Sequence, residues 1–389
     1  MKKSKVSKAS PKKTPRLPYF RPVWAEISHK NLRHNLSEIS RLLPPRTSVL
    51  AVVKANAYGH GLVPVSRTLS AAGVAFLGIT SVEESLELKK AGIRTPALIL
   101  GNIYPFSNLE TAIKNSVRVT VASVESARMC DQFARKFGKK VHVHAKIDTG
   151  MNRIGVSVNN AVPFIHEILK FRSIQLEGIY THFSSSAEDP YFTKVQIDRF
   201  DGLVERLRAQ KAAPPYIHCA NSAAILRYPE THFSLVRPGL SLYGVTPVPL
   251  LDSRVDLRPI LTWKSRIIFL KDVPAGTPVS YAGTFVTQRK SKIATAAFGY
   301  ADGYRRNLSN KGWVLVNGRR VPAIGRITMD MTMLDVTDVP SVNVGDEVVL
   351  IGKQGNETMA VQELAGWANT SPYETFCAIS SRVPRIGVD

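Results

Sequence analysis

Cysteine is scarce in this chain of 389 residues, and long apolar runs are missing from it. Its three cysteines, Cys130, Cys219 and Cys377, are an odd number in unrelated surroundings, so we expect no disulfide framework and a reducing compartment. No uninterrupted apolar run approaches the roughly 20 residues that a membrane-spanning helix needs. No apolar segment follows the basic residues at the start of the chain, which argues against a secretory signal. We therefore expect a cytoplasmic protein without a membrane partner.

Acidic residues are absent from the first part of the chain. Eight of the basic residues behind the net charge of +22 precede the first acidic residue, Glu26. Residues 1–18 are rich in Lys, Ser and Pro and have no apolar periodicity, which predicts a disordered basic tail. Contact with nucleic acid or an acidic membrane is one interpretation of such a tail, and a solubilising extension is the other. We favour the second, because no helix-turn-helix, RNP or zinc pattern accompanies the basic residues.

Between residues 49 and 244, short apolar runs alternate with segments of helical periodicity. Eight such runs are predicted strands: Val49–Val53, Val74–Ile79, Ala97–Leu100, Val117–Val121, Val141–Ile147, Leu176–His182, Tyr216–Cys219 and Ser234–Arg237. Helical patterning is clear in Ser81–Ala91, Ser123–Phe137, Asn159–Phe171 and Tyr191–Lys211. The alternation predicts an α/β fold, a (β/α)8 barrel of the TIM type, with a doubly wound sheet as the alternative. No Gly-rich dinucleotide fingerprint follows the first strand, which favours the barrel.

The pattern changes after about residue 246, where prolines become frequent and predicted strands follow one another closely. These strands are Thr262–Leu270, Lys292–Phe298, Trp313–Val316, Arg319–Ala323, Thr332–Val336 and Glu347–Ile351. Asn317-Gly318 between two of them predicts a type I′ hairpin. One late helix is predicted over Val361–Asn369. We therefore predict a barrel domain over residues 19–245 and a mainly β domain over residues 246–389.

Reactive side chains follow the predicted barrel strands, where the chemistry of this fold is found. They are Lys54 after the first strand, Lys146, Asp148 and Arg153 at the fifth, His182 at the sixth, Asn221 and Ser222 after the seventh, and Arg237 at the eighth. Five strand ends converging on one face predict an active site, although any one of these residues alone could be structural. Because phosphate sites in this fold favour the loops after strands 7 and 8, we expect phosphate donors at Ser222, Gly239 and Leu240.

Lys54 lies in the run VVKANAYGHG of residues 52–61, directly after a β-branched strand. A buried ammonium is costly, and the same cost lowers the pKa of a lysine and makes it a good Schiff-base nucleophile. The alternative for the lysine alone is a side chain that extends from the strand end to solvent.

With other motifs in the same order, this run resembles the alanine racemases from about Arg21 to Arg385. The motifs are KIDTGMNRIG (146–155), THF (181–183), NSAA (221–224), VRPG (236–239), VSY (279–281), GYADG (299–303), GRITMD (325–330), PYE (372–374) and RVPR (382–385). The resemblance implies a pyridoxal phosphate (PLP) cofactor bonded to Lys54, and no metal ion. It also implies that residues 21–27 pack with the β domain.

The resemblance assigns further cofactor contacts. The residues around the phosphate would be Tyr58, Ser222, Gly239, Leu240 and Tyr373, and Asn221 would also contact the cofactor. Arg237 would face the pyridine nitrogen, supported by His182. Because an arginine stays protonated, it can only donate to that nitrogen, which weakens the cofactor as an electron sink. That suits racemisation better than transamination.

The implied reaction is the interconversion of L- and D-alanine, which supplies D-alanine for the cell wall. Removing the α-proton from one face and returning it on the other is simplest with two bases on opposite faces. Lys54 would serve the D-isomer and Tyr281 the L-isomer. Arg153 and the backbone of Met329 would hold the substrate carboxylate. Lys146 matches the lysine that is often carbamylated in the family to hold Arg153.

In the family the tyrosine comes from the second subunit, so we expect a homodimer with shared active sites. Three other enzyme or binding classes share parts of this pattern. A PLP decarboxylase of the same architecture has an acid where this chain has Arg237, and a Gly-rich phosphate loop that is missing here. A PLP-binding homeostasis protein is a single barrel without the β domain. A racemase of broader substrate range stays open, although such an enzyme would usually be exported.

Overall fold

The computed structural model of the protein describes residues 20–248 and 255–389. The predicted basic tail, residues 1–18, lies outside the described residues. The described residues divide into two compact units: residues 26–261 with 385–389 form the barrel unit, and residues 262–384 with 20–25 form the β unit. Within the described residues, no helix combines the length and the apolar character needed to cross a membrane.

Eight parallel strands form the sheet of the barrel unit, in the order β10-β2-β3-β4-β5-β6-β8-β9. Their bounds are β2 (Ser48–Val52), β3 (Phe76–Ile79), β4 (Ala97–Ile99), β5 (Arg118–Val121), β6 (Val141–Asp148), β8 (Ile174–Tyr180), β9 (Tyr216–His218) and β10 (Leu235–Val236), with the short β7 (Val156–Ser157) paired to β6. Between the two end strands, the amide of Arg237 donates to the carbonyl of Ala220 at 2.9 Å. The sheet is therefore a nearly closed barrel, and the predicted fold class is confirmed.

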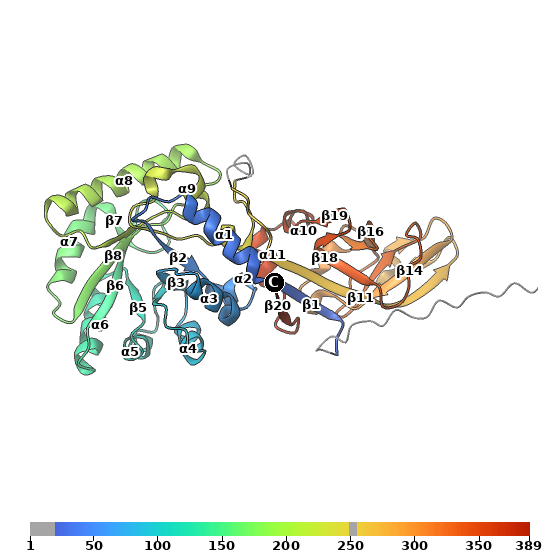
Figure 1. Cartoon of the computed structure of the whole chain (residues 1–389), viewed down its shortest axis with the longest axis horizontal. Coiled ribbons are helices and arrows are strands. Elements are labelled where there is room, and N and C mark those ends of the chain that lie inside the picture. The colour runs from blue at the N-terminus through green and yellow to red at the C-terminus, as the bar shows by residue number, and fades with distance from the viewer. Residues whose placement is uncertain (1–19, 249–254) are drawn as a thin grey trace, which may run out of the picture. The chain divides into compact units, whose positions relative to one another are not determined.

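Helices cover the outer side of these strands (Figure 1). The helices of the barrel unit are α1 (His29–Arg41), α3 (Leu62–Ala71), α4 (Val82–Lys90), α5 (Ser107–Lys114), α6 (Val124–Lys136), α7 (Val158–Leu169), α8 (Pro190–Ala209) and α9 (Ser222–Arg227), with 3-10 turns η1 (Pro229–Thr231) and η2 (Leu240–Tyr243). The segment α2 (Lys54–Tyr58) is a left-handed turn that follows β2. Helix α6 shows why they form. Ser123 caps its first turn by accepting from the Ser126 amide, and Ala127, Cys130 and Ala134 line one buried face at helical spacing.

The core of the barrel unit has two layers. Apolar side chains of the strands, such as Leu50, Leu77 and Val143, are fully buried. Because successive side chains of a strand point to opposite faces, the alternate residues form the lining of the barrel. That lining is unusually polar, since His144, Lys146 and His218 are buried there. Buried polar groups of this kind need partners, and the partners make the site described below.

The β unit contains most of a sheet in the order β19-β18-β15-β16-β17-β14-β11-β1, in which β11 also pairs with β18. The bounds are β1 (Val23–Ser28), β11 (Leu261–Val273), β14 (Ser291–Ala296), β15 (Trp313–Val316), β16 (Arg319–Ile324), β17 (Thr332–Asp335), β18 (Glu347–Gln354) and β19 (Glu357–Met359), with a separate pair β12 (Pro278–Val279) and β13 (Phe285–Val286). The last strand of the chain, β20 (Arg385–Val388), belongs to the barrel unit. The turn between β15 and β16 has positive φ at Asn317 (48°) and Gly318 (74°), as the predicted type I′ hairpin requires.

Short helical segments complete the β unit. The late helix predicted over Val361–Asn369 is present as α10 (Val361–Trp367). A second helix, α11 (Pro372–Ala378), follows it and was not predicted, because seven residues give too little periodicity to detect. Three 3-10 turns are η4 (Tyr281–Gly283), η5 (Tyr300–Asp302) and η6 (Arg306–Leu308).

Candidate functional site

Lys54 is half-buried at the end of β2 and begins a left-handed turn. The next four residues all have positive φ, although none is glycine: Ala55 (53°), Asn56 (55°), Ala57 (54°) and Tyr58 (52°). Each such residue costs roughly 1–2 kcal/mol, so the surroundings must fix the turn. The side-chain oxygen of Asn56 accepts from the amide of Leu62 at 2.7 Å, which ties the turn to α3. The backbone at Lys54 is therefore held by contacts on both sides.

The loops after β9 and β10 meet at the buried hydroxyl of Ser222. Its Oγ accepts hydrogen bonds from the amide of Gly239 at 2.9 Å and from the amide of Ser241 at 3.2 Å. A Cβ added at Gly239 would lie 2.7 Å from the hydroxyl of Tyr58, so the tyrosine contacts bare backbone there. Leu240 begins η2 directly after this glycine. The structure thus brings together four of the residues predicted to surround a phosphate.

Asn221 has a different part in this cluster. Its side-chain oxygen caps α9 by accepting from the amide of Ala224 at 3.0 Å, and it also accepts from the hydroxyl of Ser186 at 2.9 Å. The cap fixes the first turn of α9, in which Ser222 lies. Hydroxyl and amide donors from two adjacent loops, without a carboxylate among these residues, suit an anion such as a phosphate monoester.

Arg237 is the charged group at the end of β10, and it is 3% exposed. Its Nη2 donates to the carbonyls of Thr181 at 2.8 Å and Cys219 at 3.0 Å, and to Nδ1 of His182 at 3.2 Å. Burial, followed by the charge of Arg237, holds the pKa of His182 well below its ordinary value. His182 is therefore a neutral acceptor that orients the guanidinium, as the sequence predicted in placing the two together.

Lys146 lies inside the barrel on β6 and is 6% exposed. Its Nζ donates to the carbonyl of Ile147 at 3.0 Å and lies 5.3 Å from the centre of the Tyr180 ring. Burial, followed by the charge of Arg237, lowers the pKa of Lys146 to about 7. A large fraction of the side chain is thus an uncharged amine at neutral pH, and such an amine is nucleophilic.

Arg153 is exposed on the loop that follows β6. Oδ1 of Asp148 folds this loop by accepting from the amides of Gly150 at 2.9 Å and Asn152 at 3.1 Å. Asp148, identified in the sequence among the strand-end residues, therefore shapes the backbone that carries Arg153.

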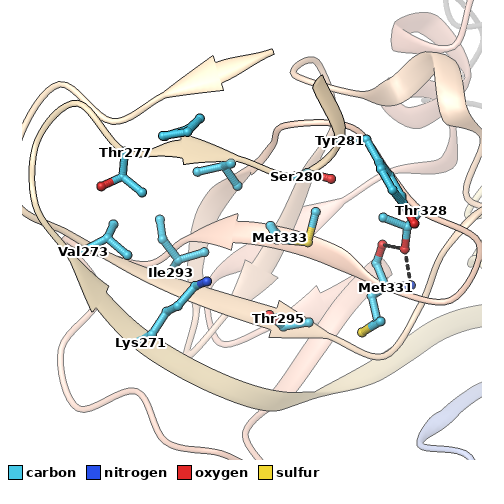
Figure 2. A pocket seen from close by; sticks show the side chains of 12 residues that line it. Lys271, Val273, Thr277, Ser280, Tyr281, Ile293, Thr295, Thr328, Met331 and Met333 are labelled. Carbon is cyan, nitrogen blue, oxygen red and sulfur yellow. Dashed lines mark hydrogen bonds between the residues drawn. The ribbon is translucent and has the colours of Figure 1, made fainter. Parts of the chain in front are cut away.

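Three predicted site residues belong to the β unit and are well exposed: Tyr281 (69%), Met329 (53%) and Tyr373 (42%). Tyr281 stands at one end of a pocket of about 420 Å³, beside Thr328 and Met331, as Figure 2 shows. The residue before it, Ser280, has a positive φ of 64° and donates from Oγ to the carbonyl of Arg326 at 2.6 Å. The pocket therefore joins Tyr281 to the loop of Met329, and Tyr373, on α11, is not part of its lining.

Sequence reasoning missed several groups that line the barrel behind Arg237. His218 accepts from Nη1 of Arg237 at 3.0 Å, and Tyr180 stacks on His218 with ring centres 4.8 Å apart. His144 and Glu177 continue this polar lining. A signal was present, because His142, His144 and Lys146 alternate along one predicted strand and so share one face.

Two family models together match nearly all of the described chain. Residues 27–247 match the alanine racemase N-terminal domain, and residues 260–387 match the alanine racemase C-terminal domain. The chain belongs to the alanine racemase family.

The alignments with relatives in this family cover almost the full length of this chain and of each relative. An alanine racemase of Halothermothrix orenii is 45% identical over 366 residues, which are 94% of this chain and 96% of that protein. One of Syntrophobacter fumaroxidans is 43% identical over 357 residues, covering 92% and 95%. Among solved structures, the alanine racemase of Clostridium difficile 630 is 37% identical with a TM-score of 0.89, covering 94% and 96%. The alanine racemase of Bacillus anthracis with bound L-Ala-P is 35% identical with a TM-score of 0.89, covering 96% of each chain.

Proposed function

We propose that this protein is a PLP-dependent enzyme that interconverts L- and D-alanine and supplies D-alanine for peptidoglycan. Membership of the alanine racemase family supports the reaction. The single observation that carries the site is the convergence of Lys54, the Ser222 cluster and buried Arg237 on the strand ends of one barrel unit.

The residues of the barrel unit fit PLP. The hydroxyls of Tyr58 and Ser222 and the amide of Gly239 would hold its phosphate, Lys54 would bond to its aldehyde carbon, and Arg237 would donate to its ring nitrogen. The close approach of the Tyr58 hydroxyl to Gly239, where an added Cβ would lie 2.7 Å from it, supports this assignment. When bound, PLP supplies an electron sink for the carbanion formed at the α-carbon.

Two side chains would move the proton. The amine of Lys54 would take the α-proton of D-alanine and return a proton to form that isomer. The phenol of Tyr281 does the same for L-alanine. Tyr281 lies in the β unit and is exposed. We therefore propose that it completes the active site in the barrel unit of a second subunit, in a homodimer.

Arg237 separates this proposal from a PLP decarboxylase. A guanidinium can donate to the ring nitrogen and cannot protonate it, so the electron sink stays weak. A weak sink would favour the return of a proton to the α-carbon over transamination. The family match supports the same choice.

The loop after β6 would bind the substrate. Arg153 would pair with the alanine carboxylate and the cofactor phenolate, and the amide of Met329 would donate to the same carboxylate. We also propose that Lys146 is carbamylated. Its uncharged Nζ attacks the carbon of CO2, an N–C bond forms, and one N–H proton passes to water, which leaves an anionic carbamate to hold Arg153. Labelling with ¹³C-bicarbonate should give a carbamate signal that Lys146→Ala removes, and its absence from the native protein would exclude the modification.

Racemisation assays with purified protein and PLP test the proposed function. We expect rapid interconversion of L- and D-alanine, and much slower turnover of serine, lysine and arginine. Because one methylene in a pocket is worth only roughly 1–3 kcal/mol, comparable rates on larger side chains would identify a broader racemase. Release of CO2 without racemisation would overturn the proposal in favour of a decarboxylase.

A further inference from the structure

Hydrogen bonds continue from Arg237 down the inside of the barrel, away from the proposed cofactor. Nη1 of Arg237 lies 3.0 Å from Nδ1 of His218, and Nε2 of His218 lies 2.8 Å from Nδ1 of His144. Nε2 of His144 lies 3.3 Å from a carboxylate oxygen of Glu177. Arg118 is the last member of this series of hydrogen bonds and donates to both carboxylate oxygens of Glu177, at 3.0 and 3.3 Å. Five residues on four strands and the loop after β10 thus form one relay.

The chemistry of its ends fixes the direction of every bond in the relay. Arg237 can only donate, so Nδ1 of His218 must accept and the proton of that ring is on Nε2. His218 then donates to Nδ1 of His144, whose own proton is on Nε2 and points at Glu177. An ionised carboxylate can only accept, which completes the sequence. Both imidazoles are therefore neutral, and both have the Nε2–H tautomer.

The electrostatics agree with this assignment. Burial, followed by the charge of Arg237, holds the pKa of His218 well below its ordinary value. Burial also lowers the pKa of His144, although Glu177 opposes that shift. For Glu177 burial opposes ionisation, but the bonds from His144 and Arg118 outweigh it and hold the pKa at about 2. The negative charge of the relay therefore lies on Glu177, between His144 and Arg118.

That charge matters because Arg237 is buried. Within residues 20–248 and 255–389 its hydrogen bonds go to carbonyls and imidazoles and to no carboxylate. Taking a guanidinium out of water is costly unless an opposite charge compensates for it. The relay through His218 and His144 connects Arg237 to the carboxylate of Glu177. The negative charge of Glu177 polarises the two imidazoles, which makes His218 a stronger acceptor for Arg237.

The barrel is shaped around the two rings. A Cβ added at Gly178, inside β8, would collide with Nδ1 of His144, so this strand position has room only for glycine. Tyr180 lies nearly parallel to His218, with 8° between the ring planes. Tyr216 lies at 13° to the ring plane of His144, with ring centres 6.3 Å apart. Packing of this kind prevents the imidazoles from turning over and reversing the relay.

We propose that Glu177 is a positioning residue for the reaction: through His144 and His218 it fixes Arg237 as a charged, correctly oriented donor at the proposed cofactor site. The tautomers follow from the relay alone. The effect on catalysis rests on the proposed function, because it requires Arg237 to face the cofactor ring nitrogen.

Nitrogen NMR of the purified chain with ¹⁵N-labelled histidine tests the tautomers directly. Signals of the two rings are assigned by their loss in His144→Gln and His218→Gln. We expect a neutral Nε2–H ring for each at neutral pH. An Nδ1–H tautomer or an imidazolium at either position would overturn the relay, whether or not the chain racemises alanine.

Glu177→Gln tests the charge and preserves the size of the side chain. We expect kcat to fall about ten-fold with KM for alanine within about two-fold, because a charged hydrogen-bond partner is lost behind the site. Gly178→Ala should lower kcat similarly by displacing His144. Asp131→Asn is the matched control: Asp131 is a buried carboxylate of the same unit that bonds Arg135 and the amide of Ser173, so it should leave kcat unchanged.

The outcomes separate the two proposals. Native kcat in Glu177→Gln, together with a damaged Arg237→Lys, would overturn the role of Glu177 and leave the proposed function standing. Native kcat in Arg237→Lys and Arg237→Glu as well would contradict the proposed role of Arg237. If Glu177→Gln and Asp131→Asn lose kcat equally and both have a lowered melting temperature, Glu177 has only a structural role.

Discussion

The two units present their candidate chemistry in opposite ways. In the barrel unit, Lys146, Ser222 and Arg237 are buried and hydrogen-bonded to other groups of the same unit. In the β unit, Tyr281 and Met329 stand in the open beside a pocket. Buried polar groups must find their partners within their own unit, because unsatisfied ones destabilise it. An exposed tyrosine on a strained turn carries no such requirement, and its position suits contact with another surface.

We therefore expect the two units to contribute different components of the active site. The barrel unit is expected to hold cofactor, electrostatics and one base by itself, while the β unit contributes the second base only after assembly. Damage inside the barrel should therefore be severe and local to one chain. Damage to Tyr281 should be repairable by another chain.

Lys54→Ala should have the largest effect, since it removes both the covalent anchor of the cofactor and one base. We expect racemisation to fall by at least about 10⁴-fold, the upper range for a general acid–base group. The absorbance of the lysine-bound cofactor should disappear as well. Lys136→Ala, at an exposed lysine on α6, is the control and should retain both properties. If Lys54→Ala keeps that absorbance without added amine, another lysine binds the cofactor.

Arg237→Glu should slow racemisation by roughly 100-fold, because it reverses a buried charge at the site. A carboxylate there would accept a hydrogen bond from the ring nitrogen and strengthen the electron sink. Side transamination should therefore become a larger share of the turnover. The ratio of racemisation to transamination, measured with L-alanine, checks this. An unchanged ratio would contradict the role argued for Arg237.

Much of the barrel was readable from its sequence. All eight predicted strands are present, because runs such as Val49–Val53 and Val141–Ile147 are apolar and bounded by helical periodicity. The two-residue strands β7, β12 and β13 were not predicted, since a pair of residues has no pattern to recognise. Helix α1 escaped notice for another reason: it lies before the first predicted barrel strand, although Leu32, Leu36 and Ile39 mark its buried face.

The site was readable only at strand ends, where position along the chain gives position in the fold. Ser222 and Gly239 follow neighbouring strands, so their meeting could be expected. The contact of His144 with Glu177 could not, because it depends on register. Strands β6 and β8 shift register between Val143 and His144, and that irregularity sets His144 beside Gly178. Sequence spacing contains no information about such a shift.

Mixing two inactive variants, Lys54→Ala and Tyr281→Ala, tests whether the β unit serves a second chain. If each site takes its lysine from one subunit and its tyrosine from the other, a mixed dimer has one intact site and one doubly damaged site. Random exchange makes about half of the dimers mixed, so activity should recover to roughly a quarter of the native value.

Subunit exchange must be demonstrated in the same samples, for example by energy transfer between labelled chains. With exchange shown, absence of recovery would mean that Tyr281 acts within its own chain. The homodimer with shared sites would then be wrong, and the exposure of Tyr281 would need another explanation.

Lys146→Met should have the smallest effect. It measures how much the buried ammonium of Lys146 lowers the free energy of unfolding. The pKa of Lys146 is about 7 in the folded protein, against roughly 10.4 for an unfolded lysine. Below pH 7 Lys146 is protonated in both the folded and the unfolded protein, so the full cost of burying its ammonium is present. Lys146→Met should therefore be more stable than the native protein at this pH. Between these values the unfolded chain binds more protons, so the native protein gains stability as pH rises.

The advantage of Lys146→Met in free energy of unfolding should therefore be a few kcal/mol at pH 6 and shrink steadily toward pH 10. Denaturant unfolding in CO2-free buffer measures it, since a carbamate would abolish the ammonium. Arg128→Met, at an exposed position on α6, is the control and should show no such trend. If the advantage of Lys146→Met stays constant with pH, Lys146 does not titrate in this window, and its role as an uncharged nucleophile is lost.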